Sequence, residues 1–194
     1  LAFDPIAEQT THVFPGEFPV VETYPEIDTD LLYEDDTKLG VRPFHITLAI
    51  AEIGTVSQNG LIYDEELVNT IAEQLRGRGG VRGHVPKDQM GSAYPLDAVN
   101  WIGHKMVDNR LWAKGYIPPG ETRGDLRRKM ATKGQVGTSV FGKAIREQVS
   151  AKQWRAKNFQ LDSVDLAPPA RAAMLVNDGQ FTITSETSMS SSSG

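Results

Sequence analysis

The order of strand-like and helix-like segments constrains this fold more than any other feature of the sequence. Apolar stretches rich in β-formers predict strands at residues 44–53, 99–107, 111–117, 136–144 and 159–166. Helices are predicted only at residues 64–76 and 122–133, so the regular βαβα alternation of a doubly wound sheet is absent. The sequence therefore predicts an α+β domain whose core is a bent antiparallel β-sheet or barrel with surrounding helices.

Local signals support two of these elements. Asp64 is placed to begin a helix, because acidic residues follow it in the first turn, where the helix dipole stabilises negative charge. Leu67, Ile71 and Leu75 then repeat every four residues and predict the buried face of that helix. Asp108-Asn109 is a strong turn signal, and it predicts that residues 99–107 and 111–117 form a hairpin.

The composition limits the classes of protein to which the chain can belong. Its 194 residues suit one domain, and no stretch approaches the roughly 18 consecutive apolar residues of a membrane span. The sequence does not contain a basic segment followed by an apolar one, which is the pattern of a secretory signal. Cysteine is absent, which excludes disulfides, zinc–thiolate sites and a cysteine nucleophile. Because the chain starts at Leu1 and not at methionine, we expect that an upstream piece has been removed.

The net charge of −5 is spread unevenly and suggests three parts. Residues 1–40 contain ten acids, one base and four prolines, and we interpret them as an extended acidic arm with a short strand at residues 18–22. The remaining residues hold fifteen acids and nineteen bases, a net charge of +4. Residues 41–184 are predicted to form the main folded domain, and residues 185–194 a disordered tail rich in Ser and Thr.

One of the four histidines has the surroundings of a catalytic group. His45 and His104 fall inside predicted strands, where a structural histidine is the usual explanation, and His12 lies in the acidic arm. His84 lies in a glycine-rich, loop-like segment at residues 76–85, at its junction with a possible short strand, and catalytic groups concentrate on loops. His84 is therefore the candidate general base.

Ser139 is the candidate nucleophile. It lies in the segment Gly-Thr-Ser-Val-Phe-Gly at residues 137–142, on a predicted strand that directly follows a helix. Glycine on both sides leaves the backbone open for a carbonyl to approach and for an oxyanion to be held. The spacing differs from the Gly-x-Ser-x-Gly elbow of the α/β-hydrolases. A strand serine between glycines with no catalytic role is the alternative interpretation.

Two aspartates are candidates for orienting the histidine. Asp162 and Asp165 are three residues apart, and in a regular strand that spacing places them on opposite faces. At most one of them can therefore share a site with Ser139. Asp165 has apolar neighbours just before a pair of prolines, where a carboxylate needs a hydrogen-bonded partner such as an imidazole N–H. The alternative is an aspartate that caps the turn at the strand end.

The order of these segments resembles the prohead proteases of tailed bacteriophages, which share a fold and a Ser–His core with the herpesvirus assemblins. Three parts carry the resemblance: His84 after its loop, the strand, helix and Ser-Val-Phe-Gly strand at residues 115–142, and the last strand with its prolines at residues 159–170. The likeness covers residues 44–174 and leaves out the acidic arm. Assemblins use a second histidine in place of an aspartate, so Asp165 matches only a branch of the family with a Ser–His–Asp triad.

The resemblance implies a serine endopeptidase in which Ser139 attacks a peptide carbonyl, His84 transfers the proton and Asp165 orients the imidazole. The implied substrates are scaffold and major capsid proteins, together with the protease's own ends, inside an immature prohead in the host cytoplasm. No cofactor, membrane or specific nucleic acid is implied, and a homo-oligomer is compatible with the resemblance. A catalytically inactive capsid-assembly or scaffold protein with the same fold is the alternative, and an unrelated binding module is a further one.

Other charged residues are candidates for additional sites. Arg171 resembles an assemblin arginine that assists an oxyanion, but a surface position is the simpler interpretation. The arginines of the glycine-rich loop lack the interleaved aromatic residues of a nucleic-acid surface. His84, His104 and the nearby acids match no zinc signature, so no metal site is predicted; these acids are Asp88, Asp97 and Asp108.

Overall fold

The computed structural model of the chain describes residues 3–11, 18–57, 59–80, 98–120, 126–128, 130–132, 137–167 and 182–185. For residues 4–11 and 182–185 it describes the backbone only. Among the described residues, no helix has the length and apolar character that crossing a membrane requires.

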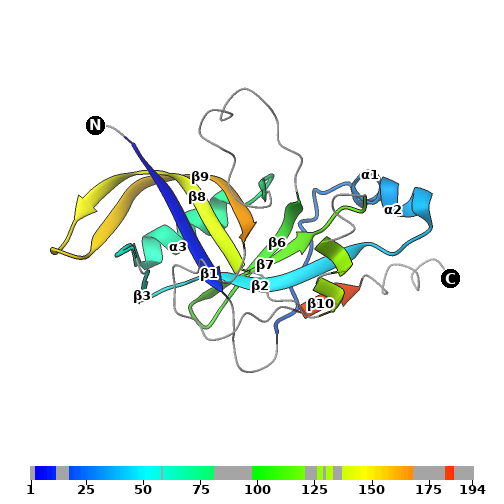
Figure 1. The fold of residues 1–194 in the computed structure, drawn as a ribbon, viewed down its shortest axis with the longest axis horizontal. Helices are drawn as coiled ribbons and strands as arrows, with labels where there is room; N and C mark the ends of the chain where they lie inside the picture. The colour runs from blue at the N-terminus through cyan, green and yellow to red at the C-terminus, as the bar shows by residue number, and fades with distance from the viewer. Residues whose placement is uncertain are drawn as a thin grey trace.

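Two antiparallel sheets form the body of the molecule (Figure 1). The five-stranded sheet has the order β10-β2-β7-β6-β5, and the three-stranded sheet has the order β1-β8-β9. Strands β3 and β4 form a separate small ladder. The bounds of the strands are β1 Asp4–Thr11, β2 Phe44–Glu52, β3 Thr55–Val56, β4 Ile62–Tyr63, β5 Gly79–Gly80, β6 Val99–Val107, β7 Arg110–Tyr116, β8 Gly137–Gln148, β9 Trp154–Ala167 and β10 Thr182–Ser185. The described helices are α1 Thr29–Leu32, α2 Glu34–Leu39 and α3 Glu65–Gln74.

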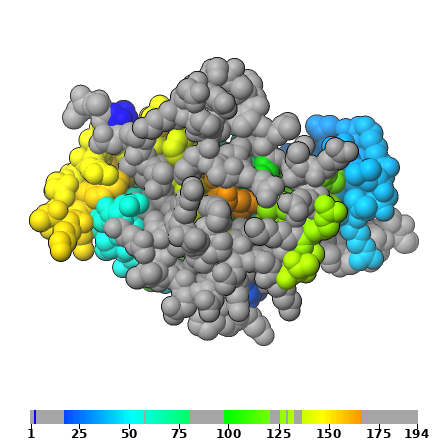
Figure 2. Space-filling model, in the orientation of Figure 1, coloured from blue at the N-terminus to red at the C-terminus, as the bar shows by residue number. Residues whose placement is uncertain are grey.

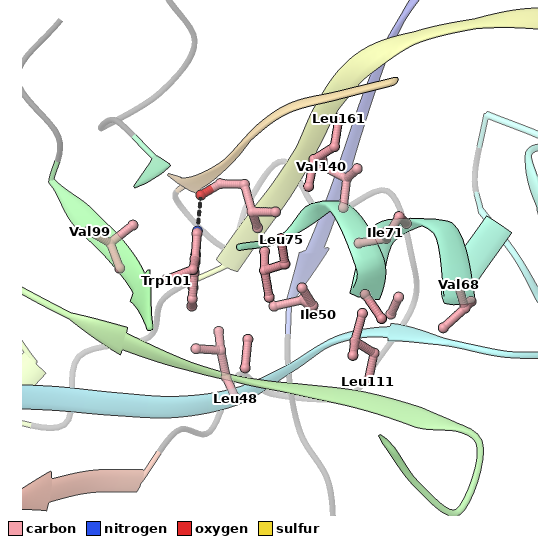
Figure 3. Close-up of a cluster of buried hydrophobic side chains, with 14 of the residues drawn as sticks. Leu48, Ile50, Val68, Ile71, Leu75, Val99, Trp101, Leu111, Val140 and Leu161 are labelled. Atoms are coloured by element: carbon pink, nitrogen blue, oxygen red, sulfur yellow. Dashed lines mark hydrogen bonds between the residues drawn. The ribbon is translucent and has the colours of Figure 1, made fainter. Parts of the chain in front are cut away.

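The main hydrophobic core lies around α3, between the two sheets. Figure 3 shows α3 with β8 and β9 on one side and β2 and β7 on the other. Leu67, Val68, Ile71, Ala72 and Leu75 supply the buried face of this helix. They pack with side chains of both sheets, among them Ile46, Leu48 and Ile50 of β2, Leu111 of β7, Val140 of β8, and Leu161 and Val164 of β9.

The two sheets also meet directly at β9. The indole N–H of Trp101, on β6, donates a hydrogen bond of 3.0 Å to the carbonyl oxygen of Val164 (Figure 3). Gly80 of β5 lies against the same carbonyl, so closely that a Cβ there would overlap it. Only glycine fits at that position without a shift of the backbone. The sheets thus curl around α3 into a half-barrel that is fixed at this junction.

Several elements predicted from sequence are confirmed. Asp64 caps α3, where its carboxylate accepts a hydrogen bond of 2.9 Å from the backbone N–H of Leu67. Asp108 and Asn109 form the turn between β6 and β7 with φ of 50° and 65°, as a tight hairpin requires. The five predicted strands correspond to β2, β6, β7, β8 and β9. The predicted mixed fold with a bent antiparallel sheet is therefore confirmed.

The last two strands are longer than the sequence indicated. β8 and β9 continue past the body as a paired ribbon out to Gln148 and Trp154 (Figures 1 and 2). Their outer residues are largely polar and exposed, so the apolar pattern on which the prediction rested ends before the strands do. Residues 126–128 of the second predicted helix are helical and Leu126 is buried, whereas its proposed cap, Thr122, lies outside the described residues.

The N-terminal segment differs most from expectation. Residues 18–22 do not form the predicted strand, because they cross the outer face of the five-stranded sheet, where Phe18 packs edge-on against Trp112. Farther along, the backbone N–H of Tyr24 donates to the carbonyl of Ile102 at 2.6 Å. The helices α1 and α2, and the strand β1 beside β8, were not anticipated. The division of the chain into arm, catalytic domain and tail stays a prediction.

Candidate active site

Ser139 lies near the start of β8, the middle strand of the three-stranded sheet. Its neighbour Val140 faces the core, and alternation along the strand therefore turns Ser139 to the opposite face. Ser139 is nevertheless buried, with 1% of its surface exposed. A buried polar side chain is more informative than a buried apolar one, because few polar groups are withdrawn from water on folding.

Asp165 is the direct cross-strand neighbour of Ser139. The two residues are partners in the antiparallel pairing of β8 with β9, one register step beyond the core pair Val140 and Val164. Residues directly opposite in such a ladder have Cα atoms about 4.5–5.5 Å apart and side chains on the same face. Asp165 is also 1% exposed. Strand pairing therefore brings two of the three predicted catalytic residues together in one buried place.

Asp162, the other aspartate considered, lies in a different environment. The pairing of Phe141 with Ser163 is followed by that of Gly142 with Leu161, so Asp162 is the extra residue of a β-bulge. Its side chain is exposed. The regular alternation assumed for these two aspartates is broken at the bulge, and Asp165 alone of the two is buried with Ser139.

His84 lies outside the described residues, and its geometry relative to Ser139 stays a prediction. Arg171, Asp88 and Asp97 lie outside them too, as does His12 of the predicted arm. The last described residue before His84 is Gly80, at the end of β5.

Two residues beside the site were not singled out from sequence. Gly80 and Trp101 both contact the carbonyl of Val164, whose peptide group leads directly into Asp165. The Gly79-Gly80 pair was visible as part of a glycine-rich loop, but nothing local indicated that its second glycine packs against β9. The partner of the Trp101 indole is 63 positions away in the chain, so no short-range pattern reveals it.

The two histidines within the described ranges, His45 and His104, pair with tyrosines, as expected for structural residues. Nε2 of His45 is 2.8 Å from the Tyr33 hydroxyl, and Nδ1 of His104 is 2.5 Å from the Tyr24 hydroxyl. Burial, and secondarily the positive charge of Arg76, lower the pKa of His104. Burial likewise raises the pKa of Tyr24 to about 12, so that its hydroxyl stays protonated near neutral pH. These pairs join the N-terminal segment to β2 and β6.

The described arginines of the glycine-rich loop make contacts within the chain. Arg76 forms an ion pair with Glu26, and its guanidinium lies 4.1 Å from the centre of the Tyr24 ring. Nε of Arg78 donates to the carbonyl of Gln74 at 3.3 Å. Within the described ranges, no three His, Asp or Glu side chains are grouped so that they could hold a metal ion.

No protein-family description matches the chain, and no curated protein is similar to it in sequence. A solved structure of the bacteriophage T4 capsid assembly protease, gp21, aligns with a TM-score of 0.58 at 13% identity. The alignment covers 85% of this chain and 98% of that one. The chain has the fold of a phage capsid assembly protease.

That likeness confirms the resemblance to phage prohead proteases at the level of fold. The role in capsid maturation, the peptidase activity, the serine type and the triad stay predictions. The relationship to herpesvirus assemblins also stays a prediction. The unrelated binding module required the candidate residues to lie far apart, and for Ser139 and Asp165 that expectation is wrong.

Proposed function

We propose that this protein is a serine endopeptidase that cleaves scaffold and capsid proteins inside the immature prohead. The observation that carries the proposal is the direct pairing of Ser139 with Asp165, both buried on the face of the sheet opposite to the core. The pairing occurs in a fold shared with a capsid assembly protease.

Covalent geometry supports the assignment of His84 as the base. Gly80 packs against the Val164 carbonyl, and Val164 is one residue from Asp165. A chain spans at most about 3.6 Å per residue, so four residues reach no farther than about 14 Å from Gly80. The Gly80 contact thus leaves His84 within covalent reach of the strands that carry Ser139 and Asp165.

The proposed mechanism uses each residue in one role. His84 takes the proton of the Ser139 hydroxyl as its Oγ attacks the peptide carbonyl, and it then returns that proton to the leaving amine. The Asp165 carboxylate accepts a hydrogen bond from the other ring nitrogen, which fixes the tautomer and stabilises the imidazolium.

A fluorophosphonate probe tests the nucleophile directly, because it forms a covalent bond only with an activated serine. We expect stoichiometric labelling of the wild-type chain and none of Ser139→Ala. Ser163→Ala is the matched control: Ser163 lies two residues from Asp165, faces Phe141 across the ladder, and should be dispensable. Labelling that survives in Ser139→Ala, or is lost equally in both variants, would contradict the assignment. A folded wild-type chain that takes no label would favour a catalytically inactive capsid-assembly protein.

A further inference from the structure

The projecting ribbon of β8 and β9 carries positive charge in a chain whose net charge is negative. Residues 143–160 hold five basic residues and one acid, a net charge of +4 against −5 for the complete sequence. Figure 2 shows the ribbon at one end of the molecule. All five basic side chains are exposed: Lys143, Arg146, Lys152, Arg155 and Lys157. Surface charge concentrated in this way attracts a partner of the opposite charge.

The face of the sheet that carries Ser139 continues onto this ribbon. Val140 and Ala144 of β8 belong to the core, so the residues that alternate with them lie on the opposite face. Exposure increases outward along that face, where Ser139 is buried, Phe141 is half-buried and Lys143 is exposed. A path for an extended chain therefore leads from the ribbon toward the proposed nucleophile.

Two lysines lie beside an apolar side chain on that path. Ile145, which is half-buried, is the cross-strand partner of Lys157, and cross-strand partners have their side chains on one face. Lys143 precedes Ile145 by two residues and lies on the same face. At a rise of about 3.3 Å per residue, Lys143 is about 13 Å along the strand from Ser139, and Ile145 is about 20 Å from it. We call Lys143, Ile145 and Lys157 the lysine strip.

The ion pairs of the ribbon leave the lysine strip open to a partner. Nζ of Lys157 pairs with the Glu147 carboxylate at 2.7 Å, and both side chains are exposed. Such exposed pairs contribute little to stability, so a carboxylate of a partner can replace Glu147 at small cost. No carboxylate whose side chain the structure describes pairs with Lys143.

We propose that the lysine strip docks an acidic segment of the protein substrate, about four to six residues from the bond that is cut. This inference rests on the proposed function, because it takes Ser139 as the nucleophile. An extended segment that passes over the strip places its carboxylates against the two ammonium groups and an apolar part against Ile145. The strip thus holds the substrate at a distance from the reacting atoms and raises its local concentration there.

The chemistry of the ribbon favours an acidic protein segment over nucleic acid. Single strands bind through bases that stack on aromatic side chains, and the two aromatic residues of the ribbon, Trp154 and Phe159, are buried. The described ion pairs of the ribbon are made with carboxylates, those of Glu147 and Asp64. The strip also shares its face with Ser139, as a docking site for a substrate protein requires.

Fluorophosphonates joined to short peptides test whether the strip acts beside the nucleophile. Two acidic probes carry four Glu-Ser repeats, joined to the fluorophosphonate at the N-terminal or the C-terminal end by a spacer of about 13 Å, so that both chain directions are covered. Two neutral probes carry Gln-Ser repeats instead. We expect one acidic probe to label Ser139 of the wild-type chain at least about tenfold faster than its neutral counterpart, because docking raises the local concentration of the reactive group.

Lys143→Gln with Lys157→Gln should remove most of that preference for the acidic probe. Arg128→Gln with Lys152→Gln is the matched control, because it removes the same charge from two exposed positions outside the strip, and it should keep the preference. An equal loss in both double variants would indicate a general effect of net charge and overturn the inference. Equal labelling of the wild-type chain by acidic and neutral probes would overturn it too and leave the proposed function standing. Absence of labelling by all four probes would overturn both.

Carbodiimide cross-linking of the free Glu-Ser peptide to Ser139→Ala locates the docked segment without any catalysis. The reagent joins a carboxylate to a neighbouring lysine through an amide bond and takes up the water that is lost. We expect mass spectrometry to find adducts on Lys143 and Lys157 at least about tenfold more often than on Lys152, which lies at the tip of the same ribbon. Adducts spread evenly over the three lysines would overturn the inference. Displacement of the peptide by a single-stranded oligonucleotide that binds more tightly would assign the strip to nucleic acid and overturn it as well.

Discussion

A carboxylate withdrawn from water needs compensation by hydrogen bonds or by a positive charge, and Asp165 is withdrawn almost completely. In a triad, the imidazole N–H supplies part of that compensation, and the imidazolium formed during the reaction supplies more. Asp162 at the bulge is hydrated and has no such requirement. The two aspartates, chemically identical and three residues apart, therefore differ in their capacity to orient a histidine.

Asp165→Asn should lower kcat by about four orders of magnitude, because an asparagine favours the wrong imidazole tautomer. The fold should persist, since the amide has nearly the same shape as the carboxylate. Asp162→Asn is the matched control and should leave kcat within a factor of two or so of the wild type, as expected for an exposed side chain. Peptide hydrolysis rates and melting temperatures of both variants provide the check. A greater loss of kcat in Asp162→Asn than in Asp165→Asn would show that Asp162 orients the histidine.

The identity of the site residues could be predicted from sequence, but their arrangement could not. Ser139 was recognisable from its flanking glycines, and Asp165 from its apolar neighbours before the prolines. Their direct opposition depends on the register of two long strands that contain two irregularities. A single bulge changes that register, and the sequence around Asp162 carries no signal for one. The position of His84 relative to both residues stays a prediction.

Among the elements, β9 is held at both ends by tryptophans that make the same kind of hydrogen bond. The Trp101 indole donates to the Val164 carbonyl at 3.0 Å, near the end of β9 that carries Asp165. The Trp154 indole donates to the Asn59 carbonyl at 2.9 Å, at the other end of the strand. Both indoles are almost fully buried. Of these two bonds, only the one from Trp101 fixes the peptide group that precedes Asp165.

Trp101→Phe leaves the buried bond to the Val164 carbonyl unmade and should cost about 1–3 kcal/mol of stability. Trp154→Phe loses a part-buried bond to the exposed Asn59 and should cost about 0.5–1.5 kcal/mol. We expect only Trp101→Phe to lower kcat, with little change in KM, because it frees the backbone that positions Asp165. Chemical denaturation, steady-state kinetics and the rate of fluorophosphonate labelling separate the two effects. Equal losses of kcat in both variants would show that Trp101 acts through stability alone.

Elements with local signals were predicted well, and elements that depend on distant partners were not. The cap and the four-residue repeat of α3 lie within its own sequence, as does the turn between β6 and β7. β1 has no apolar pattern of its own, and it forms a strand because its backbone pairs with β8. The outer ribbon of β8 and β9 is likewise formed by mutual pairing beyond the end of the apolar stretch.

At the scale of the whole molecule, a buried polar cluster around Asp36 connects α2 to the rest of the fold. Its carboxylate accepts hydrogen bonds from the Tyr116 hydroxyl, at the end of β7, and from Nη2 of Arg127 at 2.7 Å. Arg127 also donates to the carbonyl of Ile117 at 2.6 Å. Burial, together with the hydrogen bond to Asp36, raises the pKa of Tyr116. Its hydroxyl therefore remains a donor at neutral pH.

This cluster sets a limit on how far the chain can be shortened. Removal of β1 would leave Asp36 in place, whereas removal of residues 1–40 would leave Arg127 without its carboxylate partner. Removing one member of a buried ion pair is strongly destabilising, because the remaining charge stays buried without compensation. Removal of residues 1–40 should therefore destabilise the chain far more than removal of β1 alone.

Asp36→Ala should reproduce that loss in the full-length chain. We expect a cost of about 3 kcal/mol, which lowers the melting temperature by about 6–12 °C in a domain of this size. Asp35→Ala, one position earlier in α2 and exposed, is the matched control and should change it little. Adding Arg127→Met to Asp36→Ala should restore part of the stability, because no charge then remains buried and unpaired. Equal melting temperatures for Asp35→Ala and Asp36→Ala, or no recovery in the double variant, would show that the ion pair does not hold α2 to the body.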